Sequence, residues 1–235
     1  MLLTILRSGL TGMDLVLTLI AYLISTLVTV ILVLPFHEFA HAFAADKLGD
    51  PSPRYSGRLT LKPFAHIDWI GALMILVVGF GWAKPVQVNM NNFDKPKRDM
   101  ALVAAAGPLS NLLVSFVSAL LFGATTAIYI KANDPSEAAY IIYLVFANIF
   151  NFLMSVNVTL AIFNLIPIPP LDGSRVLTAF LPNRAYYKMM QLERYFSIII
   201  IILCVSGALS GVLGKATDGV CAFMLDISYR IFGLI

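Results

Sequence analysis

The sequence predicts an all-α polytopic membrane protein, and two observations lead to this fold class. Of its 235 residues, 59% are hydrophobic and only 12% are charged, whereas soluble domains usually carry about 25% charged residues. Four uncharged runs reach the roughly 20 residues that a transmembrane helix needs, and they cover residues 15–36, 100–130, 138–171 and 195–214. We therefore expect about four to six transmembrane helices in a single domain that covers residues 1–235.

The expected helices follow from the positions of caps and breaks. Asp14 is a suitable N-cap for a first helix, which runs to about Leu48, where the sequence GDP stops it. Further helices are expected at about 98–130, 136–164, 173–181 and 195–210. A last segment, 212–235, is expected to lie at the membrane interface because it contains Asp218, Asp226 and Arg230. The motif-bearing core covers about 14–185, and C-terminal helices fill 190–235.

Residues 52–99 have a different texture from the helices around them. Prolines, glycines and short alternating pieces such as RYSGRLTL and WAKPVQVNM predict strands and turns. Irregular backbone at membrane depth is tolerated only where protein covers it or water reaches it. We therefore expect a short membrane-associated β or irregular segment beside the helices, with Gly79 and Gly81 as its hinge.

The basic residues predict the orientation of the chain in a cell membrane, because cytoplasmic loops collect Lys and Arg. Eleven of them fall on the side that follows the first helix, against three on the other side. The eleven are Lys47, Arg54, Arg58, Lys62, Lys84, Lys95, Lys97, Arg98, Arg184, Lys188 and Arg194, and the three are Arg7, Lys131 and Lys215. The loop 46–99 is therefore expected in the cytoplasm and the N-terminus outside, and the charge is no sign of nucleic-acid binding.

The pentapeptide HEFAH at the end of the first helix is the strongest chemical signal. His37 and His41 are spaced i, i+4, so both imidazoles lie on one face of a helix and can reach one metal ion. Glu38 stands next to the first ligand and can accept a proton from a water molecule that zinc activates. Ionisable side chains inside a membrane helix cost a few kcal/mol each, which makes a chance match a poor explanation.

A catalytic zinc ion needs a third protein ligand, and the residues alone leave two candidates. His66 lies in the irregular segment, where a structural, hydrogen-bonded role is the favoured explanation. Asp172 lies in NLIPIPPLDG, at the far end of a long uncharged run, where an N-cap for the following helix is the alternative role. A carboxylate without a partner at that depth would be costly, however, and a cation would offset the cost.

Three stretches, HEFAH, GPLSN and NLIPIPPLDG, together resemble the site-2 protease family of intramembrane zinc metalloproteases. The pattern H-E-x-x-H followed by N-x-x-P-x-P-x-L-D-G is matched without a departure. The resemblance implies His37, His41 and Asp172 as ligands of one zinc ion per chain, Glu38 as the catalytic base, and Asn164 as a substrate-aligning residue. It favours Asp172 over His66 as the third ligand.

Two further pieces fit the same family. In AAAGPLSN, small residues permit close helix packing, and Asn111, four residues after Gly107, could instead hydrogen-bond near the site. The stretch GFGWAKPVQVNM resembles the family's short strands beside the active site, where an unwound substrate could add as a strand. A plain surface hairpin is the alternative explanation for this stretch.

These features predict an intramembrane metalloendopeptidase that hydrolyses peptide bonds in or near transmembrane segments of other proteins. The expected partners are such substrates and the lipid bilayer. The chain resembles a minimal catalytic core without an inserted peptide-binding or regulatory domain, so a regulatory membrane partner is expected to control it. The competing functions are a metal-ion transporter, which would favour ligands spread over repeated halves, and an inactive relative that only binds membrane helices. The intact Glu38 argues against the second.

Overall fold

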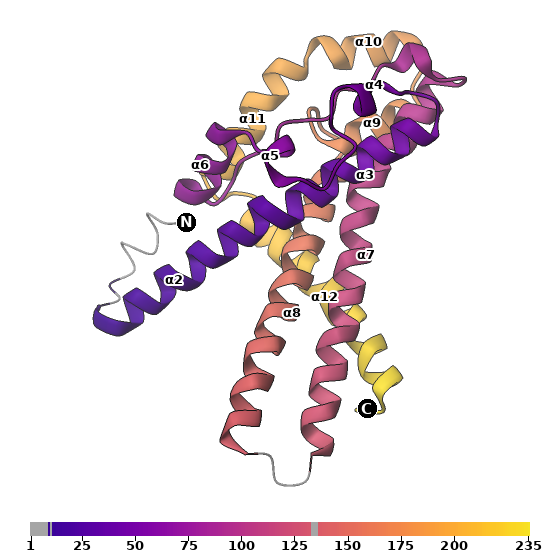
Figure 1. Ribbon diagram of the computed structural model, residues 1–235. Coiled ribbons are helices and arrows are strands. Elements are labelled where there is room, and N and C mark those ends of the chain that lie inside the picture. The colour runs from indigo at the N-terminus through magenta and orange to yellow at the C-terminus, as the bar shows by residue number, and fades with distance from the viewer. Residues whose placement is uncertain (1–8, 10, 133–135) are drawn as a thin grey trace. The chain divides into compact units, whose positions relative to one another are not determined.

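The structure is a computed structural model that describes residues 9, 11–132 and 136–235 (Figure 1). The described part of the chain is helical and contains no strand. Its elements are α2 (Gly12–Val28), η1 (Thr29–Val33), α3 (Leu34–Lys47), α4 (Ser52–Tyr55), α5 (Pro63–His66), α6 (Trp69–Val78), η2 (Met90–Asn92), α7 (Pro96–Lys131), α8 (Glu137–Asn164), α9 (Asp172–Thr178), α10 (Asn183–Gln191), α11 (Glu193–Val205) and α12 (Ser210–Phe232).

Three of the described helices are long and apolar enough to cross a membrane. They are Thr18–Lys47, which joins α2, η1 and α3, together with α7 and α8. A fourth span results if α11 and α12 form one broken span. These apolar helices agree with the predicted polytopic membrane protein, and the count of four to six stays a prediction.

The chain divides into two compact units. The first contains the described residues up to Pro108 together with 165–209, and the second contains Leu109–Asn164 and Ser210–Ile235. Helix α7 belongs to both units, since the division falls at Pro108. Whether the two units act as the single protease domain expected from the sequence stays a prediction.

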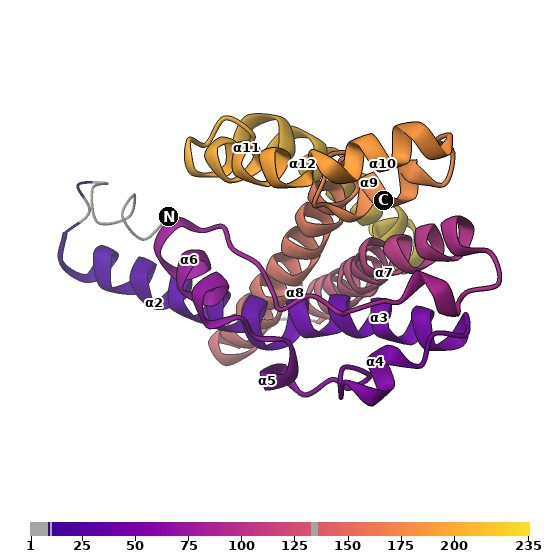
Figure 2. The ribbon, with the colours of Figure 1, turned by 90° about the horizontal axis from the view of Figure 1, so that it is seen from above.

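In the first unit, the short helices of residues 52–78 lie along the helix α2–η1–α3 (Figure 2). Helices α4 and α5 contact α3, and α6 contacts α2. A π-helical turn, η1, ends just before Pro35. Because the ring of a proline clashes with the carbonyl four residues earlier, a wider turn at this place lets the helix continue through Pro35 to the histidines.

The strands predicted within residues 52–99 are not formed in the described structure, so this part of the prediction is wrong. Short helices and turns replace the first alternating piece, and residues 80–89, called the extended stretch below, contain neither helix nor strand. The backbone is bonded in other ways: the amide of Lys84 donates to the carbonyl of His66 (2.8 Å), and the Tyr22 hydroxyl donates to the Ile75 carbonyl at the end of α6 (2.7 Å). The irregular part of the prediction is confirmed.

Glycine allows α6 and the extended stretch to lie against each other. A Cβ atom on Gly71 would overlap the carbonyl of Trp82, and one on Gly81 would overlap the carbonyl of Gly71. Any larger residue would push the extended stretch away from α6. Gly79, at φ 87°, ends α6 in the left-handed conformation that favours glycine and turns the chain back.

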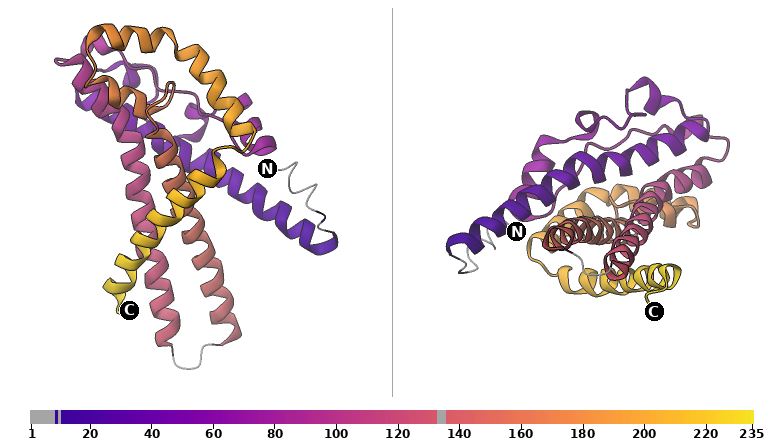
Figure 3. Two further views of the ribbon diagram at one scale, coloured as in Figure 1. Left: turned by 180° about the vertical axis from the view of Figure 1, so that it is seen from behind. Right: turned by 60° about the horizontal axis from the view of Figure 1, so that its bottom comes forward.

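The second unit contains α8, α12 and the part of α7 after Pro108, and α8 and α12 lie side by side (Figure 3). Hydroxyl groups join the helices: Ser115 donates to the Met154 carbonyl (3.0 Å), and Ser228 donates to the Ala119 carbonyl (2.8 Å). Hydrogen bonds of this kind are common between membrane helices. Helix α12 is therefore a packed helix of this unit, in which Arg230 and Asp226 pair at 2.8 Å, and its expected place at the membrane interface stays a prediction.

Candidate metal centre

Helix α3 presents the two histidines of HEFAH side by side. The sequence positions i and i+4 bring the imidazoles onto one face, with ring centroids 4.6 Å apart at an interplanar angle of 85°. The Nε2 atoms of His37 and His41 are 3.0 Å apart. Both side chains are buried, with 5% and 8% of their surfaces exposed, so a ligand held by the two nitrogens would be shielded from bulk water.

The turn that follows α8 brings Asp172 to the same place. Short backbone hydrogen bonds fold the proline-rich stretch back, from the amide of Ile168 to the Ile166 carbonyl (2.8 Å) and from the amide of Leu171 to the Ile168 carbonyl (3.0 Å). A Cβ atom on Gly173 would overlap the Leu165 carbonyl, so glycine is needed at this turn. Asp172 thereby begins α9 with its carboxylate directed at the imidazoles.

The three side chains form a triangle of ligand atoms. The Oδ2 atom of Asp172 lies 3.2 Å from Nε2 of His37 and 3.3 Å from Nε2 of His41. A tetrahedral zinc ion with metal–ligand bonds of about 2.0–2.1 Å sets neighbouring ligand atoms about 3.3–3.4 Å apart. Two imidazole nitrogens and one carboxylate oxygen, with a fourth position left for water, therefore fit a catalytic zinc ion. In the described part of the chain, this is the one such group of histidine, cysteine and acidic side chains.

The N-terminal part of α7 contacts the imidazoles at two places. Nδ1 of His41 lies 2.8 Å from the carbonyl oxygen of Val103, and because a carbonyl only accepts, this nitrogen carries the hydrogen. Neutral His41 then has its lone pair on Nε2, the atom that faces the ligand triangle. A Cβ atom on Gly107 would overlap the ring of His41, so glycine is required where α7 passes the site.

Charge in the site favours the ionised carboxylate. Burial opposes ionisation of Asp172, but the adjacent imidazoles of His41 and His37 outweigh it and hold the pKa of the carboxyl below its ordinary range. Asp172 is therefore a carboxylate at neutral pH, which is the form that coordinates a metal.

Glu38 is half-buried and is held by the extended stretch that follows α6. Its Oε2 atom accepts a hydrogen bond of 3.0 Å from the backbone amide of Val86. The carboxylate therefore has a fixed position one residue from the first imidazole.

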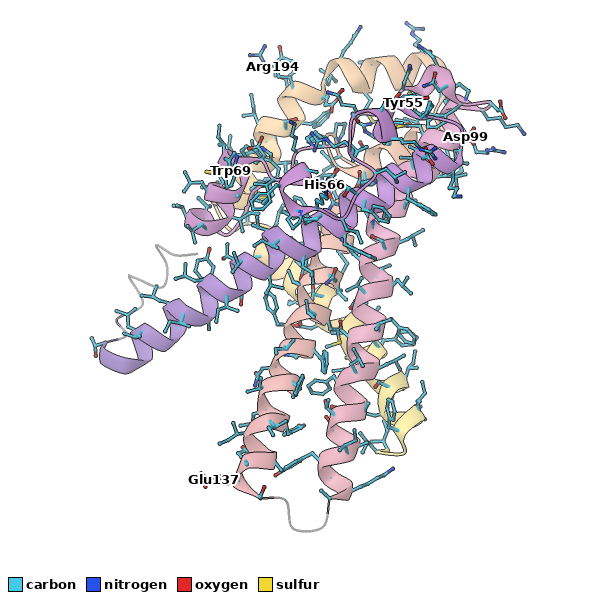
Figure 4. The ribbon with its side chains drawn as sticks, viewed as in Figure 1. Tyr55, His66, Trp69, Asp99, Glu137 and Arg194 are labelled. Atoms are coloured by element: carbon cyan, nitrogen blue, oxygen red, sulfur yellow. The ribbon has the colours of Figure 1, made fainter. Side chains whose placement is uncertain are left out.

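His66, the alternative third ligand, does not join the triangle. It is buried in α5, with 1% of its surface exposed, and its Nε2 donates to the Thr60 carbonyl (2.8 Å). Figure 4 shows it on the short helix beside the α2–η1–α3 helix. The geometry agrees with the structural role that the sequence left open for it.

Comparison with known proteins identifies the family. The family model "Peptidase family M50" matches residues 25–207. The chain belongs to peptidase family M50. This confirms the resemblance to the site-2 proteases, and the whole set of sequence motifs lies within the matched residues.

The relatives carry consistent names. "Putative zinc metalloprotease YwhC" from Bacillus subtilis (strain 168) is 39% identical over 81% of this chain and 83% of its own length. "Putative zinc metalloprotease Rip2" from Mycolicibacterium smegmatis is 30% identical over 74% of this chain and 64% of its own length. "Putative zinc metalloprotease MJ0611" from Methanocaldococcus jannaschii is 30% identical over 60% of this chain and 63% of its own length. No solved structure gives a significant match. This M50 peptidase is accordingly a membrane zinc metalloprotease.

The two asparagines predicted to support catalysis belong to the second unit. Asn111 is fully buried in α7. Asn164 is the last residue of α8, and its side-chain amide donates to the Leu160 carbonyl (3.0 Å). Their roles beside the metal and the substrate stay predictions.

Sequence reasoning missed three contributors to the site of this M50 peptidase. The Val103 carbonyl and the Val86 amide are backbone groups, and because almost every residue has such groups, the residue type does not predict their role. Gly107 was noticed in AAAGPLSN, but its small size was explained only by helix packing. In the structure, Gly107 lies against the imidazoles of the metal centre. Its place in GPLSN, one of the three stretches that carry the family resemblance, was the signal that could have indicated this contact.

Proposed function

We propose that this M50 peptidase hydrolyses peptide bonds in or near transmembrane segments of other membrane proteins. In this proposal His37, His41 and Asp172 hold one zinc ion and Glu38 is the general base. The observation that carries the proposal is the ligand triangle, with sides of 3.0, 3.2 and 3.3 Å, whose two histidines lie on a helix that is long and apolar enough to span a membrane.

When bound by these three side chains, a zinc ion would supply Lewis-acid activation of the scissile carbonyl and of the attacking water. Glu38 accepts the proton of that water and then delivers it to the leaving amine. The amide of Val86, which donates to one carboxylate oxygen, orients the side chain while the other oxygen receives the proton. His41 keeps its orientation during these steps through the Val103 carbonyl.

The substrate is a transmembrane helix that unwinds before cleavage, because peptide bonds in a helix are shielded by their hydrogen bonds. Residues 80–89 form neither a helix nor a strand with another described segment, and the amide of Val86 joins this stretch to Glu38. An unwound substrate pairs along this edge by backbone addition. Asn164 and Asn111 are assigned supporting roles in substrate alignment.

The orientation belongs to the same proposal. The basic loop 46–99 lies in the cytoplasm of the cell, the N-terminus lies outside, and the metal centre is near the cytoplasmic face. A reporter fused at Asn91 is expected to be cytoplasmic, and an extracytoplasmic reporter would contradict this orientation. A regulatory membrane partner controls access to the site.

A transporter is a weaker proposal for the same residues. A transport path would need further ligands along the helices, and the described residues contain one three-ligand group. Nothing in that group points to a second site to which an ion could move.

The substrate class is tested with two matched reporters in proteoliposomes. One contains a single transmembrane segment, and the other has the same flanking sequence with that segment replaced by a soluble one. Wild-type protein is expected to cleave the membrane reporter and to leave the soluble one intact. Equal cleavage of both would contradict a membrane-helix substrate while leaving the protease assignment in place.

A further inference from the structure

Asp50 is a buried carboxylate directly after the HEFAH helix that the metal centre does not use. It has no exposed surface, and it lies outside the apolar helices that can span the membrane. A buried carboxylate must be satisfied by hydrogen-bond donors or a cation. The identity of its donors indicates what Asp50 does.

Four hydrogen bonds reach the two oxygens of Asp50. Ser52 supplies two of them to Oδ1, from its amide (3.1 Å) and its hydroxyl (2.6 Å). The side-chain amide of Asn92 donates to Oδ1 (2.6 Å), and the backbone amide of Asn89 donates to Oδ2 (2.7 Å). The first pair stays within one turn, whereas the second pair joins Asp50 to a segment about forty residues away in sequence.

That distant segment is the extended stretch whose Val86 amide holds Glu38. Val86 and Asn89 are three residues apart in the same stretch. The amide of Val86 is bonded to Glu38, and the amide of Asn89 is bonded to Asp50. A slip of this chain by one residue, about 3.3 Å along a strand-like backbone, would carry the Val86 amide out of hydrogen-bonding reach of Glu38.

Apolar contacts also hold this stretch, but they do not select its register. Val88 and Met90 pack against the buried cluster that contains Ala45 and Val103. Hydrophobic contacts are non-directional, so they keep the segment on α3 without fixing which amide faces Glu38. The hydrogen bonds to Asp50 are directional and charge-assisted, and bonds of this kind are the shorter and stronger ones.

We propose that Asp50 is a positioning residue, which sets the register of residues 84–92 against α3 so that the Val86 amide orients the Glu38 carboxylate. This inference rests on the proposed role of Glu38 as the general base. Asp50 does not touch the ligand triangle, so it acts on the rate of the chemical step and not on zinc binding.

The test is Asp50→Asn, with Asp46→Asn as the matched control. An asparagine at 50 keeps an acceptor for Ser52 and Asn92 but turns an amide donor toward the Asn89 amide. Asp46 is an aspartate four residues earlier that pairs with exposed Arg54 (2.6 Å), so its change leaves the extended stretch untouched. Asn92→Ala, which removes one donor only, is a milder second variant.

Three quantities are measured on each purified protein: zinc per chain, amide hydrogen exchange over residues 84–92, and kcat and KM on the single-span reporter. For Asp50→Asn we expect faster exchange at Val86 and Asn89, unchanged zinc, and kcat lower by up to about 100-fold with little change in KM, which is the cost of misplacing a reacting group by ~1 Å. Asn92→Ala should show a smaller change in the same direction, and Asp46→Asn should match wild type.

Three outcomes would overturn the proposal. The first is unchanged exchange at Val86 in Asp50→Asn, and the second is faster exchange with an unchanged kcat. The third is loss of zinc together with faster exchange throughout α3 in both Asp50→Asn and Asn92→Ala, which would give Asp50 a general folding role. If zinc-loaded wild type cleaves no reporter, the proposed function fails, whereas the exchange comparison still decides whether Asp50 sets the register.

Discussion

Nδ1 of His41 donates a hydrogen bond of 2.8 Å to the main-chain carbonyl of Val103. This contact joins the HEFAH helix to the start of α7 and sets the imidazole so that Nε2 faces His37 and Asp172. Partners of this kind raise the affinity of a metal site and fix the orientation of its ligands. The metal centre therefore depends on the packing of α3 against α7 as well as on the three ligands.

Replacing Asp172 with alanine should lower the zinc content well below one ion per chain. The side chain contributes one of three ligand atoms, 3.2 and 3.3 Å from the two imidazole nitrogens, and the remaining pair of histidines is not a complete catalytic site. His66→Ala is the control, because His66 lies outside the triangle and its loss should leave the metal content unchanged. Zinc would be measured by elemental analysis after dialysis. Retained zinc in Asp172→Ala and lost zinc in His66→Ala would reverse the assignment.

Gly107→Ala should also reduce zinc binding, although it adds only one methyl group. The new Cβ atom would overlap the ring of His41 and come close to that of His37, so the imidazoles must move away from the ligand positions. Gly219→Ala is the matched control, since the Cβ there meets no atom within 4 Å and alanine favours a helix by about 1 kcal/mol over glycine. The measurement is zinc per chain beside the thermal unfolding midpoint. Full zinc occupancy in Gly107→Ala would mean that the close approach of α7 is not needed.

Removal of the metal should abolish cleavage reversibly. A chelator that strips zinc leaves the ligand triangle, Glu38 and the hydrogen bond to Val103 in the chain, so added Zn²⁺ should restore turnover. Mg²⁺ should not, because it prefers octahedral oxygen coordination and the site offers two nitrogens. Cleavage of the single-span reporter would be followed before and after chelation. Undiminished cleavage by protein that is free of zinc would rule out the metal-dependent mechanism.

The contribution of Asp50 to stability should disappear in acid. Burial raises the pKa of Asp50, but the donors Ser52, Asn89 and Asn92 outweigh it and lower the pKa below its ordinary value. A lowered folded-state pKa means that the stabilisation is complete above the unfolded-state pKa of about 4 and is lost as the pH falls through the folded-state pKa. Unfolding midpoints of wild type and Asp50→Asn should therefore differ at pH 6 and converge toward pH 2.5. A difference that does not depend on pH would contradict this account.

The sequence was sufficient to place two histidines on one helix face because helical periodicity is local, whereas the choice of Asp172 over His66 as the third ligand depended on the family resemblance. The spacing of His37 and His41 fixes their common face in any helix, and the break at IPIPPLDG marks where the chain can return to it. The apolar runs likewise predict long helices by composition alone. These parts of the structure required no knowledge of distant contacts.

The segment 52–99 could not be derived in the same way, since its conformation depends on distant groups. Alternating residues predicted strands, but a strand requires a partner segment, and none pairs with this one in the described structure. Its backbone is bonded to Asp50 and Glu38 instead. Asp50 itself was interpreted only as part of a helix stop. The residues next to it in sequence do not predict that distant groups donate hydrogen bonds to its carboxylate.

The central claim is that Glu38 transfers protons at the zinc site without being a ligand of the zinc ion. The most direct test measures zinc content and cleavage of the single-span reporter on the same purified samples of wild type and Glu38→Gln. The account predicts about equal zinc in both proteins and cleavage by wild type alone. Turnover by Glu38→Gln at the wild-type rate, with zinc bound, would contradict it.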